Sequence, residues 1–420
     1  MKILRLISVL ALILTVGALH AAIDTRQGCL DPRFRTLTVD VEGISMAPPI
    51  INLGAGDRIV ITFDELSEDH SYLRYSLLHC NSNWQPSQLV ESEYVTGFNQ
   101  ADITDYEYSR GTSVHYVHYS LAIPNQDMAP LVSGNYLLQV WEDTNPDDIL
   151  VQARFMVAEG GAAISGDISS ITDIDYNGAH QQVQLCVSTD RGQVSDPFND
   201  LIVKVQQNSR LDNEVTLVHP SRVSGNLSYY EHLNPLIFAA GNEYRRFENS
   251  SVSFPGMGVY DIEYYDPYYN FTLIPDESRA SVPYSYDQTQ HGRFKVREYN
   301  SANSDTEADY SIVHFTLNAP HLEGQRIFID GDLTNRRLDQ ESEMHYNPAT
   351  GQYEKALLLK QGAYNYQYLV YPQRPRESAT SPIEGDFFPT VNEYLITVYN
   401  RPPGARYDRL IGASRLLFNH

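Results

Sequence analysis

The chain has 420 residues, 42% of them hydrophobic, and its 53 acidic and 30 basic side chains give a formal net charge of −23. This length is too great for one compact core, and the hydrophobic content excludes a wholly disordered chain. The negative charge argues against nucleic acid and anionic membrane surfaces as partners. The 30 tyrosines, with threonine and valine recurring throughout, favour strands over helices, so the sequence predicts an all-β protein.

Residues 1–22 predict a signal peptide. Lys2 and Arg5 precede an apolar run that ends at Val16, and small residues follow up to Ala22. This order is typical of secretory signals, and the run is short for a membrane span. We therefore expect an exported protein that has no direct membrane span.

The first predicted unit, residues 23–158, contains five short segments in which apolar and polar residues alternate. Turn-forming residues separate these segments, a pattern typical of an antiparallel β-sandwich. The strings YLRYSLLHCNSNWQPSQ and SGNYLLQVWED in this unit resemble the fibronectin type III sandwich. The alternating segments are 36–41, 57–63, 113–121, 135–141 and 151–157.

The second predicted unit, residues 159–308, begins where the composition becomes rich in glycine and alanine. It contains two strand-like segments, 183–187 and 201–206, followed by the tyrosine-dense string YDIEYYDPYYNF. We expect a second β-rich domain here.

The third predicted unit, residues 309–420, again has alternating strand segments. Its string IFIDGDLTNRRLDQ resembles the early-set, immunoglobulin-like sandwich that carbohydrate-binding modules share. No tryptophan follows Gly331 and Asp332, so the residue that would stack on a sugar ring is missing. The fold class predicted for the whole chain is therefore a set of tandem β-sandwich domains.

His79 and Cys80 are adjacent and suggest thiol chemistry. On a strand, neighbouring side chains point to opposite faces, so these two residues cannot form a Cys-His dyad. We expect Cys80 to be a small buried hydrophobe and His79 to form a hydrogen bond with a neighbouring loop. The same reasoning excludes zinc binding by His115 and His118, which are three residues apart on a predicted strand.

The string DIDYNG, Asp173 to Gly178, matches the start of a calcium-binding loop. Its twelfth position is Gln184, where such a loop requires a bidentate glutamate. We therefore expect an Asx-rich turn here rather than a cation site. The three cysteines, Cys29, Cys80 and Cys186, allow at most one disulfide.

No sequence signature of a serine hydrolase, a zinc protease, a thiol redox site or a phosphate-binding loop is present. Paired carboxylates for glycoside hydrolysis stay open, because their separation is invisible in a sequence. We expect no catalytic residue, no metal and no cofactor, and we expect the protein not to be an enzyme.

Several long strings occur together in the chain: YSLLHCNSNWQPSQLVESEYVTGF, VKVQQNSRLDNE, FAAGNEYRRFE and EGDFFPTVNEYLITVYNRPPGARYDRLIG. With the signal peptide, they resemble the type IX secretion system plug protein family of the Bacteroidota over essentially the whole mature chain. The resemblance implies a periplasmic protein at the periplasmic face of the outer membrane. It also implies a role as a monomer that seals the giant outer-membrane translocon β-barrel when no substrate is in transit.

Sealing a wide lumen requires a broad protein surface, and tyrosine suits such an interface because it combines contact area with a polar tip. The candidate partner-binding residues are Glu243, Arg245, Arg246, Tyr260, Tyr264, Tyr265, Tyr268 and Tyr269. The tyrosines could instead pack between units, and the charged residues could form a salt bridge within a turn. A glycan-binding β-sandwich module is the alternative function, and a hydrolase built on a β scaffold is a third.

Overall fold

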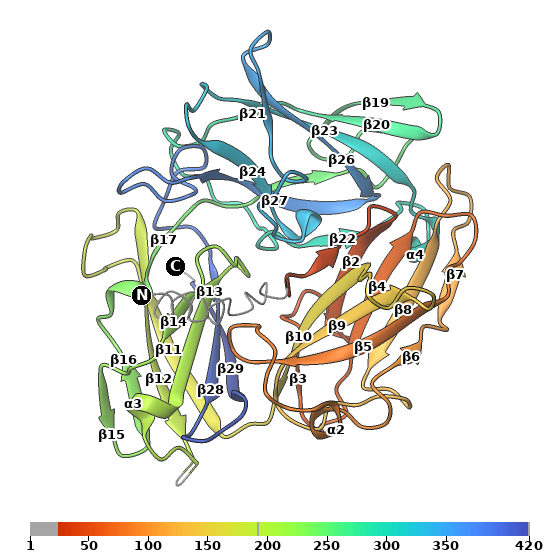
Figure 1. Cartoon of the computed structure of the whole chain (residues 1–420). Coiled ribbons are helices and arrows are strands. Elements are labelled where there is room, and N and C mark those ends of the chain that lie inside the picture. Colours follow the sequence, from red (N-terminus) through yellow and green to blue (C-terminus); the bar gives the residue numbers. More distant parts are fainter. Residues whose placement is uncertain (1–23, 191–192, 419–420) are drawn as a thin grey trace, which may run out of the picture.

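The computed structural model describes residues 24–190 and 193–418. The predicted signal peptide, residues 1–22, lies outside the described residues. The regular structure of the described chain is almost entirely β-strand, arranged as three β-sandwiches (Figure 1). In Figure 1 the first sandwich lies at the lower right, the second at the lower left and the third at the top. The predicted all-β fold of several sandwiches is therefore confirmed.

The first sandwich consists of two sheets built from residues 28–158. Its larger sheet contains β1 (Gly28–Cys29), β10 (Val151–Ala158), β9 (Gly134–Glu142), β5 (Leu73–Cys80) and β6 (Ala101–Asp102), with β3 (Ile50–Asn52) beside β10. The smaller sheet contains β2 (Phe34–Val41), β4 (Ile59–Glu65), β8 (Val117–Ile123) and β7 (Tyr106–Tyr108).

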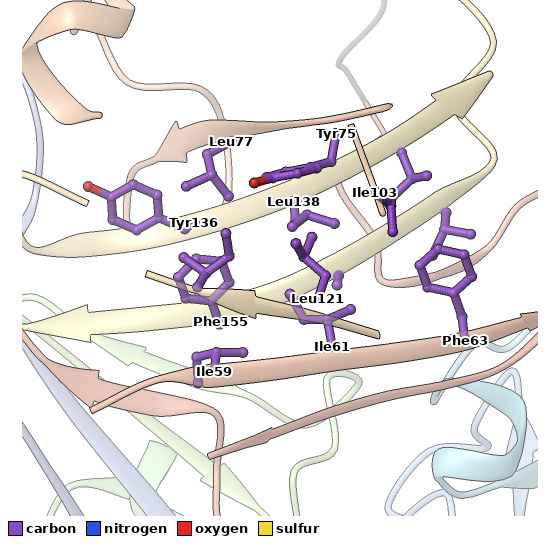
Figure 2. Packing of buried hydrophobic residues seen from close by; sticks show 14 of the residues in the cluster. Ile59, Ile61, Phe63, Tyr75, Leu77, Ile103, Leu121, Tyr136, Leu138 and Phe155 are labelled. Carbon is purple, nitrogen blue, oxygen red and sulfur yellow. The ribbon is translucent and has the colours of Figure 1, made fainter. Parts of the chain in front are cut away.

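The core of the first sandwich lies between these two sheets. On β4, Ile59, Ile61 and Phe63 alternate toward the interior, as the period of two predicts. Figure 2 shows these side chains below Tyr75 and Leu77 of β5, which enter the same core from the opposite sheet. The apolar residues that alternate in the sequence of β4 are therefore the ones that pack in the core.

The second sandwich is discontinuous in the sequence. Its first sheet contains β11 (Ala162–Ser169), β12 (His180–Thr189), β16 (Leu227–Tyr230), β15 (Arg222–Ser224) and β17 (Ile237–Ala239). Its second sheet contains β14 (Val215–Leu217), β13 (Leu201–Gln207), β28 (Glu393–Asn400) and β29 (Arg409–Leu417). The last two strands therefore come from the C-terminal end of the chain.

The third sandwich is inserted between β17 and β28. One sheet contains β18 (Arg245–Glu248), β27 (Gly362–Tyr371), β22 (Phe294–Val296) and β24 (Arg326–Asp330). The other contains β19 (Val259–Tyr265), β20 (Tyr268–Leu273), β23 (Tyr310–Asn318), β26 (Gln352–Lys360), β25 (His345–Asn347) and β21 (Asp276–Glu277).

This connectivity corrects two predicted boundaries. The boundary between 159–308 and 309–420 falls inside the third sandwich, because β18, β20, β21 and β22 pair with strands that follow it. The C-terminal part of 309–420 belongs to the second sandwich, because β28 pairs with β13 along its whole length, from Leu201 opposite Asn400 to Gln207 opposite Tyr394. Both strands bury apolar side chains in one core, so the pairing is fixed by packing between segments far apart in sequence.

Helices contribute little to the fold. The three α-helices of the described residues have four residues each: α2 (Glu91–Tyr94), α3 (Pro197–Asp200) and α4 (Ser304–Glu307). Within residues 24–190 and 193–418, no helix has the length and apolar character needed to cross a membrane.

Buried polar contacts join the three sandwiches. Between the first and third, Lys360 Nζ lies 2.6 Å from Asp64 Oδ2, and both side chains are 1% exposed. Between the first and second, the Tyr399 hydroxyl donates to Asn135 Oδ1 at 2.7 Å. Each sandwich has its own core, and these contacts join the cores into one body.

Candidate partner-binding surface

His79 and Cys80 lie at the end of β5 and serve the packing of the first sandwich. His79 Nδ1 lies 2.8 Å from Ser87 Oγ, and its Nε2 lies 3.1 Å from the carbonyl oxygen of Ser133. Burial lowers the pKa of His79 to about 4 and raises the pKa of the Cys80 thiol to about 12. The predicted structural roles of both residues are confirmed, since His79 bonds to neighbouring loops and Cys80 is buried.

Gly134 explains how the imidazole of His79 fits. This residue begins β9 with a φ of +140°, and a Cβ atom added to it would lie 2.4 Å from His79 Nε2. Only glycine provides both the backbone conformation and the space. The glycine of the string SGNY is therefore required by packing against the histidine.

The string DIDYNG, which matches the start of a calcium-binding loop, forms a turn whose carboxylates already have hydrogen-bond partners. Asp173 accepts a hydrogen bond from Gln182 Nε2 at 2.7 Å. Asp175 Oδ2 lies 2.7 Å from His180 Nδ1 and accepts the amide of Ala179 at 2.9 Å. The predicted Asx-rich turn is confirmed by these bonds. No group of three or more metal-ligating side chains occurs in the described part of the chain.

The three cysteines form no disulfide with one another, and His115 and His118 each pair with a carboxylate. Cys29, Cys80 and Cys186 are free thiols. His115 pairs with Glu68 and His118 pairs with Asp64, each at 2.7 Å, so the two histidines bind different carboxylates.

Two of the predicted partner-binding residues are buried inside the third sandwich. The Glu243 carboxylate accepts hydrogen bonds from the Tyr284 hydroxyl at 2.7 Å and from the Val391 amide at 2.9 Å. Arg245 lies 2.6 Å from Asp276 and 3.0 Å from Glu384, and its side chain is 8% exposed. These groups connect the strands of the sandwich to the segment that leads into β28, so they are unable to offer a free surface.

Arg246 lies at the margin of the same region. Its guanidinium forms two hydrogen bonds to Asp287, at 2.9 and 2.7 Å. The pairing joins β18 to the long connection before β22, so the salt bridge links distant segments. Sequence reasoning anticipated such a bridge within one turn, whereas the acidic partners come from 30 or more residues away.

The predicted tyrosine cluster occupies the hairpin of β19 and β20. Tyr260, Tyr264 and Tyr265 are 73%, 49% and 61% exposed. Tyr268 and Tyr269 are half-buried on β20, where they pair with Tyr265 and Tyr264. The tyrosines therefore divide into three that face solvent and two that support them.

The rings of this cluster do not form a flat platform. Tyr264 and Tyr269 have their centroids 4.8 Å apart, with the ring planes inclined at 53°. The Tyr264 hydroxyl donates to Asp266 Oδ1 at 3.0 Å, which fixes it over the turn. A glycan-binding module would require coplanar exposed rings, so this geometry does not favour that alternative.

Sequence reasoning missed two acidic residues of the same strand. Asp261 and Glu263 are exposed on β19 between the tyrosines. The signal was present in the string YDIEYYDPYYNF, where acidic residues alternate with aromatic ones. The exposed strand thus carries aromatic area and negative charge together.

Two cavities lie where the sandwiches meet. One, of about 230 Å³, lies between the first and third sandwiches and is lined by Phe34, Phe294 and Tyr364 among others. The other, of about 200 Å³, lies at the junction of all three, with Trp84, Lys204 and Arg336 in its walls. Neither cavity was anticipated, since each depends on how the separate units pack.

Comparison with known proteins identifies the family. The model of the type 9 secretion system plug protein first domain matches residues 34–159. A crystal structure of a hypothetical protein from Parabacteroides merdae is 43% identical and covers 94% of this chain and 99% of its own, with a TM-score of 0.91. The chain belongs to the type IX secretion system plug protein family. The predicted family is thereby confirmed, and this protein has a role related to type IX secretion.

Other matches add nothing to this identification. No curated protein matches this chain. An alkylpurine DNA glycosylase from Pseudomonas fluorescens is 14% identical over 30% of each chain, and its TM-score of 0.19 carries no structural argument. The plug-domain match covers the first sandwich from β2 to β10, all of it except the two-residue β1, so this unit corresponds to the family's first domain.

Proposed function

We propose that this protein is a periplasmic plug that binds the periplasmic opening of the type IX outer-membrane translocon barrel and seals it when no substrate is in transit. The observation that carries the proposal is that the plug-family domain is joined to two further sandwiches by buried contacts. A seal across a wide lumen must keep its shape, and buried, fully paired polar groups hold one arrangement of the units.

The exposed tyrosines of β19 are the contact surface that we assign to this function. Tyr260 and Tyr265 expose more than half of their side chains, and tyrosine contributes contact area at low conformational cost. Glu243 and Arg245 act indirectly, because they hold the sandwich that carries the hairpin. The proposal includes export by the predicted signal peptide, since the partner faces the periplasm.

The proposal includes no catalytic step. Asp40, Glu214 and Asp332 line the central cavity, but Glu214 pairs with Lys204 and Asp332 accepts a hydrogen bond from Arg336 at 2.8 Å, so Asp40 is the one carboxylate of the three without an ion pair in the described residues. Carboxylates neutralised in this way are poor candidates for the paired acid and base of a glycoside hydrolase.

Affinity purification tests the proposal. The tagged full chain is recovered from detergent-solubilised outer membranes of cells that make both partners, and the expected result is co-recovery of a very large barrel protein. A double variant, Tyr260→Ser with Tyr265→Ser, should weaken recovery. The matched control is Tyr176→Ser with Tyr286→Ser, which removes two tyrosines that are 73% and 63% exposed elsewhere. Recovery of no barrel with the unmodified protein would sink the proposal.

A further inference from the structure

Strand β19 leaves one of its backbone edges open. It is the outermost strand of a six-stranded sheet, and β20 pairs with it on one side. An edge strand presents a row of unpaired N–H and C=O groups that can accept another strand. β19 has seven residues, enough for several such bonds.

The other long edge strands of the described sandwiches are covered. β2 runs along the interface with the third sandwich, where Thr36 Oγ1 lies 2.6 Å from the Tyr310 hydroxyl. The edges of β11 and β29 meet each other, since a Cβ atom placed on Gly412 would lie 2.8 Å from the carbonyl oxygen of Ala162. Among the long edges, β19 is therefore the one without a covering segment in the described chain.

The side chains of β19 specify the chemistry of an added strand. Asp261 and Glu263 are exposed, and the carboxylate of Asp261 accepts from the adjacent amide of Ile262 at 2.9 Å. Neither residue takes part in an ion pair within residues 24–190 and 193–418. Opposite charges on directly facing strand residues stabilise a pair, so lysine or arginine is the matching residue type.

A second copy of this chain fits the edge poorly. Antiparallel pairing of β19 with itself about Ile262 would place Asp261 opposite Glu263, and parallel pairing in register would place each acid opposite itself. Like charges that face each other across strands are destabilising. The acidic residues thus keep copies of the protein apart while leaving the edge available to a basic strand.

The hairpin is also prepared for binding. β20 pairs in parallel with β23 from Tyr269 to Thr272, which ties the hairpin to the core of the third sandwich. The Tyr264 hydroxyl donates to Asp266 at 3.0 Å, so the turn of the hairpin is held in place. A fixed edge avoids the entropic cost of ordering a loop on binding.

We infer that β19 receives an extended strand of the translocon by strand addition, with lysine or arginine side chains meeting Asp261 and Glu263 and apolar or aromatic ones meeting the exposed tyrosines. The inference rests on the proposed plug function and adds the mode of contact. Strand addition takes affinity from main-chain bonds and specificity from the alternating side chains.

Hydrogen exchange at single-residue resolution tests the inference, using the full chain alone and in complex with the detergent-solubilised barrel. Amides of β19 that bond to β20 exchange slowly in both states. The amides of alternate residues point outward, and strand addition should slow their exchange at least about tenfold on binding. Side-chain contact without strand addition does not produce this alternation.

A charge-reversal variant provides the second arm. Asp261→Lys with Glu263→Lys should weaken barrel binding about tenfold, because basic residues would then face basic residues. The matched control is Asp147→Lys with Asp148→Lys, which makes the same change of charge at two exposed acids of a first-sandwich turn. Unchanged thermal unfolding of both variants shows that the fold is intact.

The outcomes distinguish a failure of strand addition at β19 from a failure of the proposed plug function. Alternating protection together with weaker binding of the β19 variant supports the inference. Barrel binding without protection of residues 259–265, or equal affinities of the two charge-reversal variants, overturns strand addition and leaves the plug function standing. Absence of any barrel binding by the unmodified chain overturns both.

Discussion

Lys360 and Asp64 form a buried ion pair across the interface of the first and third sandwiches. The ammonium nitrogen of Lys360 lies 2.6 Å from Asp64 Oδ2, which also accepts the Tyr310 hydroxyl at 2.7 Å, while His118 Nδ1 lies 2.7 Å from Asp64 Oδ1. Burial alone would raise the pKa of Asp64, but Lys360 and His118 outweigh it and lower that pKa. The carboxylate is therefore charged and depends on its partners.

Removal of the ammonium should destabilise the protein strongly. Lys360→Met leaves a buried carboxylate unpaired, and the free energy of unfolding should fall by about 3–5 kcal/mol. Urea unfolding followed by tyrosine fluorescence measures the change. The control is Arg326→Met, which breaks the more exposed pair with Glu343 and should cost less than about 1 kcal/mol. Equal losses in the two variants would contradict the assigned role of the buried pair.

Stability should depend on pH through His79. The pKa of this histidine is about 4 in the folded state, below its ordinary value of 6.5, because burial disfavours the imidazolium. The unfolded chain then binds the extra proton first, so the contribution is complete above about pH 6.5 and is lost as the pH falls toward 4. His79→Gln should flatten the dependence of the unfolding free energy on pH in this window. An unaltered slope in His79→Gln would refute the assignment.

Protonation of Glu384 should lower the stability of the fold at a lower pH than protonation of His79 does. Burial opposes ionisation of Glu384, but Arg245 and Arg279 lower its pKa to about 2, below the ordinary 4.5. This contribution is present above about pH 4.5 and disappears as the pH falls through 2. Glu384→Gln should therefore lose stability at neutral pH and show a smaller further loss between pH 4.5 and 2. Thermal unfolding across this range measures both effects, and a slope equal to that of the unmodified chain would count against the ion pairs.

The Asp173 loop should not respond to calcium. Its carboxylates bond to Gln182, His180 and His232, so a cation would have to displace them. A ligand that binds only the folded state raises the unfolding temperature, and the increase grows with the logarithm of ligand concentration above the Kd. We expect the same unfolding temperature in millimolar calcium and in chelator. A calcium-dependent increase that Asp173→Asn abolishes would show that the turn is a cation site.

The C-terminal strands should be energetically coupled to the second sandwich. Val205 of β13 faces Ile396 of β28, and both are fully buried. Ile396→Ala should cost about 2–5 kcal/mol, and combining it with Val205→Ala should give a non-additive loss because the two share one core. Additive losses in the double-mutant cycle would contradict this pairing.

Local patterns predicted much of the fold, while pairing between distant segments escaped them. Period-two alternation identified the strand around Ile59 to Phe63 and the strand that ends at Cys80, because that signal lies within a few residues. The sequence could not show that β28 pairs with β13, because the residue pattern of β28 predicts a strand but does not indicate which sheet it joins. The third sandwich was divided at residue 308 for the same reason.

The candidate site was predicted in composition more than in geometry. The string YDIEYYDPYYNF indicated an aromatic surface, and three of its tyrosines are exposed. Its neighbours Glu243 and Arg245 are buried by Tyr284, Glu384 and Asp276, partners that lie 30 to 140 residues away and that no short motif reveals. Exposure at a sheet edge is a property of the assembled sheet, so the open side of β19 required the structure.

The most direct test of the plug function is the conductance of the purified translocon barrel in a planar bilayer. Addition of the full chain to the periplasmic side should close the open barrel in a saturable manner, and Tyr260→Ser with Tyr265→Ser should require a higher protein concentration for the same closure. Unchanged conductance at a concentration that saturates binding would contradict the account, because the protein would then bind the barrel without sealing it.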